Sequence, residues 1–163
     1  MRTVASSLIE LCTQVRAIFL QEPRLLKLKP PVYVLGDVHG NFRDLVCFEK
    51  AFWRLGITLT PSNFLFLGDY VDRGAYCVEV VAYLFAQKII SPNKFHLLRG
   101  NHELRRIQQN FTFYQECQEK FGSGELADRV WTSVNAAFDA MPIAAVVDSK
   151  IFCVHGGKYF SKN

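Results

Sequence analysis

The stretch Gly68-Asp69-Tyr70-Val71-Asp72-Arg73-Gly74 directly follows the apolar run of residues 64–67. Two further polar stretches follow apolar runs in the same way: residues 36–40 (GDVHG) after 32–35, and residues 99–103 (RGNHE) after 95–98. Short apolar runs of this kind predict buried strands, each ending in a polar loop. Because loops at one end of adjacent strands converge in space, the pattern predicts an α/β fold with one shared polar site.

The side chains in these loops are of the kinds that bind divalent metals and phosphate. The candidate site residues are Asp37, His39, Asp69, Asp72, Arg73, Asn101 and His102. Carboxylate oxygens and imidazole nitrogens are common ligands of divalent metals, and the forked guanidinium of arginine binds phosphate oxygens in pairs. A fourth apolar run, residues 151–154, is followed by His155 and repeats the pattern. Together these residues indicate phosphoester chemistry at a metal site.

Each cluster taken alone also has a purely structural explanation. Asp37 can be an ordinary turn residue beside a surface His39. Glu103 is expected to interact with the N-terminus of a following helix, and His96, inside an apolar run, is expected to pack in the core. Four strand ends that all carry metal-binding side chains are harder to explain by surface composition, so the joint pattern favours the functional interpretation.

The rest of the chain predicts helices between the strands. Hydrophobic spacing predicts helices over residues 6–21, 43–55, 77–90 and 125–140, the first with a capping box formed by Ser7 and Glu10. Residues 143–147 and 151–154 are predicted to form a hairpin, which favours a mixed or sandwiched sheet. We expect a single domain over residues 1–163, with a helical N-terminal segment at residues 1–30.

Composition limits the possible partners and the cellular location. The chain has 163 residues, half of them apolar, which is enough for one hydrophobic core. The net charge of +4 is mild, and the basic residues near the N-terminus are scattered, so we expect no nucleic-acid partner. Five cysteines without a close pair indicate reduced thiols. Neither a signal peptide nor a run of about eighteen apolar residues is found. We therefore expect no membrane partner and a location in the cytoplasm, the nucleus or both.

The loop motifs resemble the GDxHG, GDxxDRG and GNHE motifs of the PPP family of serine/threonine protein phosphatases, most closely the protein phosphatase 1-like catalytic subunits. Residues 141–145 (MPIAA) and 155–157 (HGG) also resemble that family, so the likeness covers nearly the whole chain. The resemblance implies a calcineurin-like metallophosphoesterase fold, which is a β-sandwich flanked by helices.

The resemblance also implies two divalent metal ions, manganese, iron or zinc. By analogy, Asp37, His39 and Asp69 hold the first ion. Asp69 bridges to the second ion, which Asn101 and His155 also hold. In the family, a water or hydroxide that bridges the ions attacks phosphorus.

Catalytic roles follow from the same resemblance. Arg73 and Asn101 would orient the phosphoryl oxygens, and His102 would protonate the departing serine or threonine oxygen. Asp72 would keep His102 protonated and oriented. The implied activity is hydrolysis of phosphoserine and phosphothreonine in proteins, with regulatory or scaffold subunits as further partners.

The sequence departs from the family pattern after the HGG motif. The family's catalytic domain continues and supplies a further histidine ligand and a second phosphate-binding arginine, whereas residues 158–163 form a divergent tail. We therefore expect the C-terminal half of the fold to be missing and the second metal site to be incomplete. Two alternative functions remain open: a catalytically impaired, truncated isoform that binds or competes for partners, and a dinucleoside polyphosphate hydrolase.

Overall fold

A computed structural model describes residues 2–157, so the predicted tail at residues 158–163 lies outside the described residues. Two three-stranded sheets form the centre of the molecule. The first sheet is parallel, with the strand order β2 (Val32–Leu35), β3 (Asn63–Phe66) and β4 (Phe95–Leu97). The second has the order β1 (Leu25–Leu28), β5 (Ala144–Val147) and β6 (Ile151–Val154), and it is mixed because only β5 and β6 are antiparallel.

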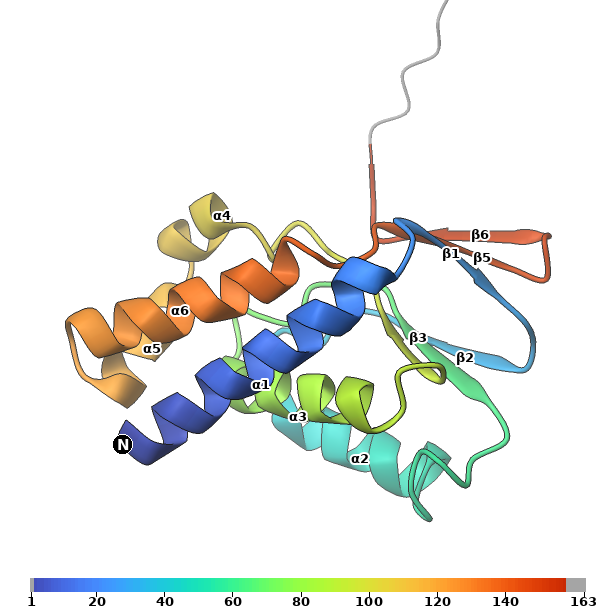
Figure 1. Cartoon of the computed structure of the whole chain (residues 1–163), viewed down its shortest axis with the longest axis horizontal. Coiled ribbons are helices and arrows are strands. Elements are labelled where there is room, and N and C mark those ends of the chain that lie inside the picture. The colour runs from blue at the N-terminus through green and yellow to red at the C-terminus, as the bar shows by residue number, and fades with distance from the viewer. Residues whose placement is uncertain (1, 158–163) are drawn as a thin grey trace, which may run out of the picture.

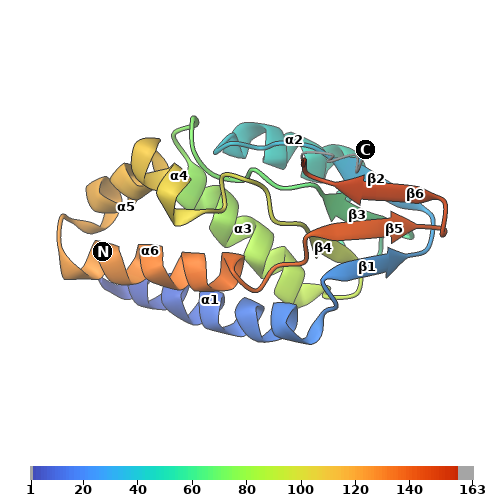
Figure 2. The same ribbon diagram turned by 90° about the horizontal axis from the view of Figure 1, so that it is seen from above.

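The two sheets pack face to face, as Figure 2 shows from above. Side chains alternate along each strand, so Leu65 of β3 points to one face of its sheet while Phe64 and Phe66 point to the other. Leu65 joins the apolar core between the sheets, and the two phenylalanines join the core under the helices. The predicted sandwich is confirmed. The core between the sheets consists of Leu26, Leu28, Leu65, Leu98, Ala145, Val147 and Cys153.

Helices form a layer against the parallel sheet and extend beyond it (Figure 1). Their bounds are α1 (Arg2–Gln21), α2 (Phe42–Phe52), α3 (Cys77–Ile90), α4 (Arg105–Asn110), α5 (Phe113–Phe121) and α6 (Glu125–Phe138). Helix α1 runs alongside α6 and also packs against α3. The strongly apolar α3 is buried along most of its length, as its composition predicts.

Helix α1 begins earlier than the sequence pattern predicts. It starts at Arg2, so Ser7 and Glu10 lie inside the helix and the predicted capping box is wrong. Ala5 is fully buried, so the apolar face of the helix extends by one more turn toward its N-terminus. Among residues 2–157, α1 alone is long and apolar enough to cross a membrane by length and composition. One face of it is nevertheless buried in the core, through Ala5, Leu8, Cys12, Val15 and Phe19.

The strand register places three polar loops at one edge of the parallel sheet. Leu35, the last residue of β2, pairs with Phe66, the last residue of β3. Phe66 in turn pairs with Leu97, the last residue of β4. The loops that follow these strands therefore begin side by side, as the sequence pattern predicts.

Candidate metal centre

Backbone hydrogen bonds and glycines hold the loops in close contact. The N–H groups of Val38 and His39 both donate to the carbonyl oxygen of Asp69, at 3.0 and 2.9 Å. A Cβ atom on Gly68 would lie 2.5 Å from the backbone nitrogen of Gly100, so the second and third loops can meet only at a glycine. The left-handed backbone region, which non-glycine residues rarely adopt, recurs in these loops. The non-glycine residues of these loops that adopt it include His39, Asp69, Asp72 and Arg73.

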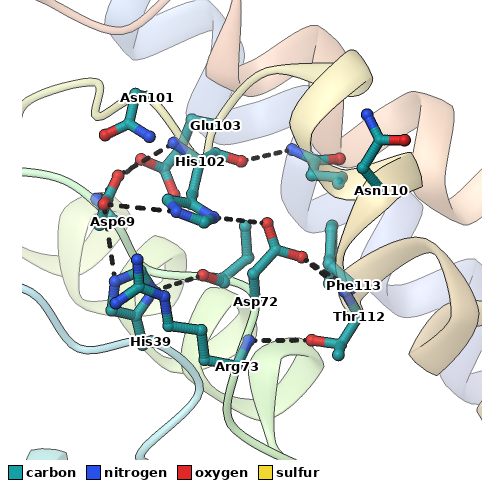
Figure 3. Close-up of polar contacts among 12 residues, drawn as sticks. His39, Asp69, Asp72, Arg73, Asn101, His102, Glu103, Asn110, Thr112 and Phe113 are labelled. Atoms are coloured by element: carbon teal, nitrogen blue, oxygen red, sulfur yellow. Dashed lines mark hydrogen bonds and ion pairs between the residues drawn. The ribbon is translucent and has the colours of Figure 1, made fainter.

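Asp69 is the centre of the polar cluster (Figure 3). Its side chain is almost completely buried, and its Oδ1 accepts the backbone N–H of His102 at 3.0 Å. Its Oδ2 lies 3.3 Å from Nε2 of His155, 3.6 Å from Nε2 of His39 and 4.0 Å from Nε2 of His102. One carboxylate thus faces three imidazoles that come from different loops.

His39 provides a direct test of whether a cation fits this cluster. Its Nδ1 lies 2.8 Å from the carbonyl oxygen of Val71, to which it donates a hydrogen bond. Its Nε2 is buried without a hydrogen-bond partner and lies 3.6 Å from carboxylate oxygens of both Asp37 and Asp69. Buried polar atoms are normally paired, and an imidazole whose other nitrogen donates to a carbonyl is a typical metal ligand. These residues therefore fit a divalent cation.

His155 approaches the same oxygen of Asp69 as His39 does, and it lies next to the other two predicted ligands, Asn101 and Asp37. Nε2 of His155 is 2.8 Å from Oδ1 of Asn101, and its Nδ1 is 3.9 Å from Oδ1 of the half-exposed Asp37. By distance alone, the ligand atoms form one group of His39, Asp69 and His102 and another of Asp37, Asp69 and His155. This grouping differs from the ligand sets that the family resemblance implies, but Asp69 is shared in both.

His102 and Asp72 form a buried pair beside this cluster (Figure 3). Nδ1 of His102 lies 2.8 Å from Oδ2 of Asp72. The other oxygen of Asp72 accepts the backbone N–H groups of Thr112 and Phe113, at 3.1 and 2.8 Å. These two N–H groups lie at the N-terminus of α5, where the helix dipole favours a carboxylate. The pair leaves Nε2 of His102 facing Asp69.

Arg73 directly follows Asp72 in the second loop, and its side chain is exposed at the rim of the site. Its backbone N–H donates to the hydroxyl oxygen of Thr112 at 2.9 Å, so α5 positions both Arg73 and the preceding Asp72. The structure thus brings all the predicted site residues to one edge of the parallel sheet.

Glu103 is a site residue whose role the sequence interpretation missed. Its fully buried carboxylate accepts three backbone N–H groups, those of Asp69, Tyr70 and Gly100, at 2.8 to 2.9 Å. Burial raises the pKa of Glu103 to about 7, although hydrogen bonds from these N–H groups oppose the shift. The predicted role at a helix N-terminus is wrong, because α4 begins only at Arg105. In the sequence, only the position of Glu103 in the third polar stretch, residues 99–103, indicated a role at the site.

A family model described as calcineurin-like phosphoesterase matches residues 30–163. The chain belongs to this family. Over 147 residues it is 41% identical to the serine/threonine-protein phosphatase PP2A-like PPG1 of Saccharomyces cerevisiae. That match covers 90% of this chain and 38% of the relative.

Two solved structures extend the comparison. A protein serine/threonine phosphatase from Saccharomyces cerevisiae with similarity to human phosphatase PP5 superimposes with a TM-score of 0.81 at 27% identity, covering 94% of this chain and 48% of the other. A cold-active protein-tyrosine phosphatase from a Shewanella species has a TM-score of 0.61 at 19% identity, covering 80% and 43%, which shows the fold alone.

The chain therefore spans less than half the length of these relatives. The predicted resemblance of this chain to serine/threonine protein phosphatases is confirmed. The finer likeness to protein phosphatase 1 is not confirmed, because the two serine/threonine phosphatases named above are PP2A-like and similar to PP5.

Proposed function

We propose that this chain hydrolyses phosphate esters of serine and threonine in proteins, in a metal-dependent reaction. The observation that carries the proposal is the cluster around Asp69, in which a buried carboxylate faces three imidazoles beside the His102–Asp72 pair. The likeness to two serine/threonine phosphatases supports this substrate class over dinucleoside polyphosphates.

Five residues would hold two divalent cations, with Asp69 between them. They are Asp37, His39, Asp69, Asn101 and His155. Mixed oxygen and nitrogen ligands suit manganese, iron and zinc. When bound there, the cations supply positive charge that polarises the phosphate ester and lowers the pKa of water.

The protein side chains bind the substrate and move the proton. Arg73, exposed at the rim, would bind phosphoryl oxygens through its guanidinium, and the amide of Asn101 would orient another. His102 would donate the proton on Nε2 to the departing serine or threonine oxygen. Asp72 would accept the hydrogen bond from Nδ1 and so fix the direction of the ring.

Partners and location are part of the same proposal. Phosphoproteins are the substrates, and regulatory or scaffold subunits bind the chain in the cytoplasm or the nucleus, without nucleic acid or membrane. The serine/threonine phosphatases to which the chain is similar support a phosphoprotein substrate.

Phosphate release from a phosphoserine peptide in the presence of Mn²⁺ tests the proposed reaction. We expect His102→Asn to lower kcat by about 10²- to 10⁴-fold, the usual contribution of a general acid. Equal rates for the wild type and the variant would contradict the role of His102. Metal binding without any phosphate release by the wild type would instead favour a binding or competitor module.

A further inference from the structure

We infer that Gln108 is a positioning residue that holds the backbone of His102 in the orientation needed for proton transfer. The inference rests on the proposed role of His102 as the acid. Gln108 lies in α4 and is fully buried, six residues after His102. Its side-chain Nε2 donates a hydrogen bond to the carbonyl oxygen of His102 at 3.0 Å.

The orientation of the Gln108 amide is set by helix α6. The indole N–H of Trp131 donates to Oε1 of Gln108 at 2.7 Å, and Nδ2 of Asn135 donates to the same oxygen at 2.8 Å. Both lone pairs of the oxygen are therefore used by donors. The NH₂ group must then point the other way, toward His102, because a flipped amide would place donors against donors.

This contact completes the restraints on His102. The backbone N–H donates to Asp69, the ring Nδ1 pairs with Asp72, and the carbonyl accepts from Gln108. Residues 101–104 form neither a helix nor a strand, so secondary structure does not fix this carbonyl group. Gln108 satisfies it and links it to α6, a helix of 14 residues that packs against α1 and α5.

The link has a consequence for catalysis that differs from its effect on stability. A shift of the His102 backbone moves Nε2 relative to Asp69, from which it is separated by 4.0 Å. Misplacement by about 1 Å can cost about 10²-fold in rate. The loss falls on substrates whose leaving group must be protonated, because only they depend on the position of the acid.

The first test compares two substrates in Gln108→Met, whose side chain has a similar length but no hydrogen-bonding amide. With Mn²⁺ present, we expect kcat for a phosphoserine peptide to fall by about ten- to a hundredfold, with KM little changed. We expect kcat for p-nitrophenyl phosphate to fall by less than about threefold, because nitrophenolate leaves without a proton.

Two further variants separate positioning from folding. Val130→Ala removes buried volume from α6 at a residue outside this hydrogen-bond network, so it should lower stability while the ratio of the two rates stays at the wild-type value. Trp131→Phe removes one donor to Gln108 and should change the ratio in the same direction as Gln108→Met, but less. If Gln108→Met does not fold, Trp131→Phe decides. An unchanged ratio in the deciding variant would overturn the inference.

A measurement without turnover distinguishes this inference from the proposed function. The ¹⁵N resonances of the His102 ring, recorded at one pH, should shift in Gln108→Met and remain in place in Val130→Ala. Resonances that do not move in Gln108→Met would overturn the positioning role. Absence of phosphate release by the wild type would contradict the proposed reaction, and the ring resonances would then still decide the role of Gln108.

Discussion

Single residues determine whether the loops of the candidate site can approach one another. A Cβ atom on Gly74 would lie 2.1 Å from the carbonyl oxygen of His39 and 2.7 Å from the carbonyl carbon of Gly40. The loop that carries Asp72 can therefore approach the loop that carries His39 only where a side chain is missing.

Gly74→Ala should lower the free energy of unfolding by about 2 to 4 kcal/mol, because backbone atoms would have to move apart. Urea denaturation measures this change. Gly36→Ala is a matched control in a neighbouring loop, since a Cβ there meets no atom within 4 Å, and it should change stability by less than about 1 kcal/mol. Equal effects of the two substitutions would contradict this description of loop packing.

The sequence predicts the residues that face the site better than those that support it. Asp69 and His155 are predictable because each closely follows an apolar run. Strand register aligns the loop of Asp69 with its neighbours in the parallel sheet, whereas His155 reaches the site from the end of β6 in the second sheet. Glu103 and Gln108 act through backbone groups of loops and through side chains on α6. Such contacts depend on tertiary packing and leave no periodic pattern in the sequence.

At the scale of elements, helix α3 takes its N-terminal cap from another helix. Its first turn has no side-chain cap from its own N-cap residue, Tyr76. Instead, the carboxylate of Glu116 on α5 accepts the N–H groups of Cys77 and Val78, at 3.0 and 2.9 Å. This carboxylate also pairs with Lys120. It thus satisfies free N–H groups and interacts favourably with the helix dipole.

Glu116→Gln should therefore lower the free energy of unfolding by about 1 to 2 kcal/mol. Glu119→Gln, about one turn away on the exposed face of α5, removes a charge whose only hydrogen bond within the described part of the chain is from Gln115, and it should cost less than about 0.5 kcal/mol. Thermal or urea unfolding of both variants measures the difference. A larger loss in Glu119→Gln than in Glu116→Gln would contradict the capping role.

A second contact between elements predicts how stability depends on pH. His96 of β4 lies near Lys88 of α3 and Glu22, which follows α1. Burial, and secondarily the charge of Lys88, lowers the pKa of His96 from 6.5 to about 4. The unfolded chain therefore binds a proton at this residue more readily than the folded chain does. The contribution of His96 to stability is present above about pH 6.5 and is lost progressively, up to about 3 kcal/mol, as the pH falls toward 4.

His96→Leu should remove this part of the pH dependence. Urea unfolding at about pH 7 and about pH 4.5 measures it, and the wild type should lose more stability between the two conditions than the variant does. Because Glu22 and Lys88 are retained, the difference reports His96. Equal losses in both proteins would show that His96 does not remain neutral in the folded state.

Element boundaries illustrate what local patterns predict and what packing changes. The bounds of α3, residues 77–90, are as predicted. The helical spacing of its apolar residues and the positions of its flanking loops indicate the same two ends. Helix α1 was predicted from residue 6 and begins at Arg2, because contacts with α6 add a turn that local capping signals did not reveal. Tertiary contacts of this kind commonly override capping signals.

At the scale of the whole molecule, three layers meet at the candidate site: the parallel sheet, the second sheet and the helices. The parallel sheet supplies the loops with Asp37, Asp69 and Asn101, and the second sheet supplies His155 at the end of β6. The helical layer supplies the backbone groups that hold Asp72. The alternation of predicted strands and helices along the sequence predicts the parallel sheet. The closing hairpin, predicted over residues 143–154, indicated only that a mixed or sandwiched sheet would follow.

The proposed reaction requires divalent cations to bind around Asp69, and thermal unfolding at increasing Mn²⁺ concentration tests this binding without requiring turnover. A ligand that binds only the folded state stabilises it by about 2.7 kcal/mol at a hundred times its Kd. The melting temperature of the wild type should therefore rise with Mn²⁺, and that of Asp69→Asn should stay constant. A wild-type melting temperature that does not respond to Mn²⁺, or an equal rise in Asp69→Asn, would contradict cation binding at Asp69.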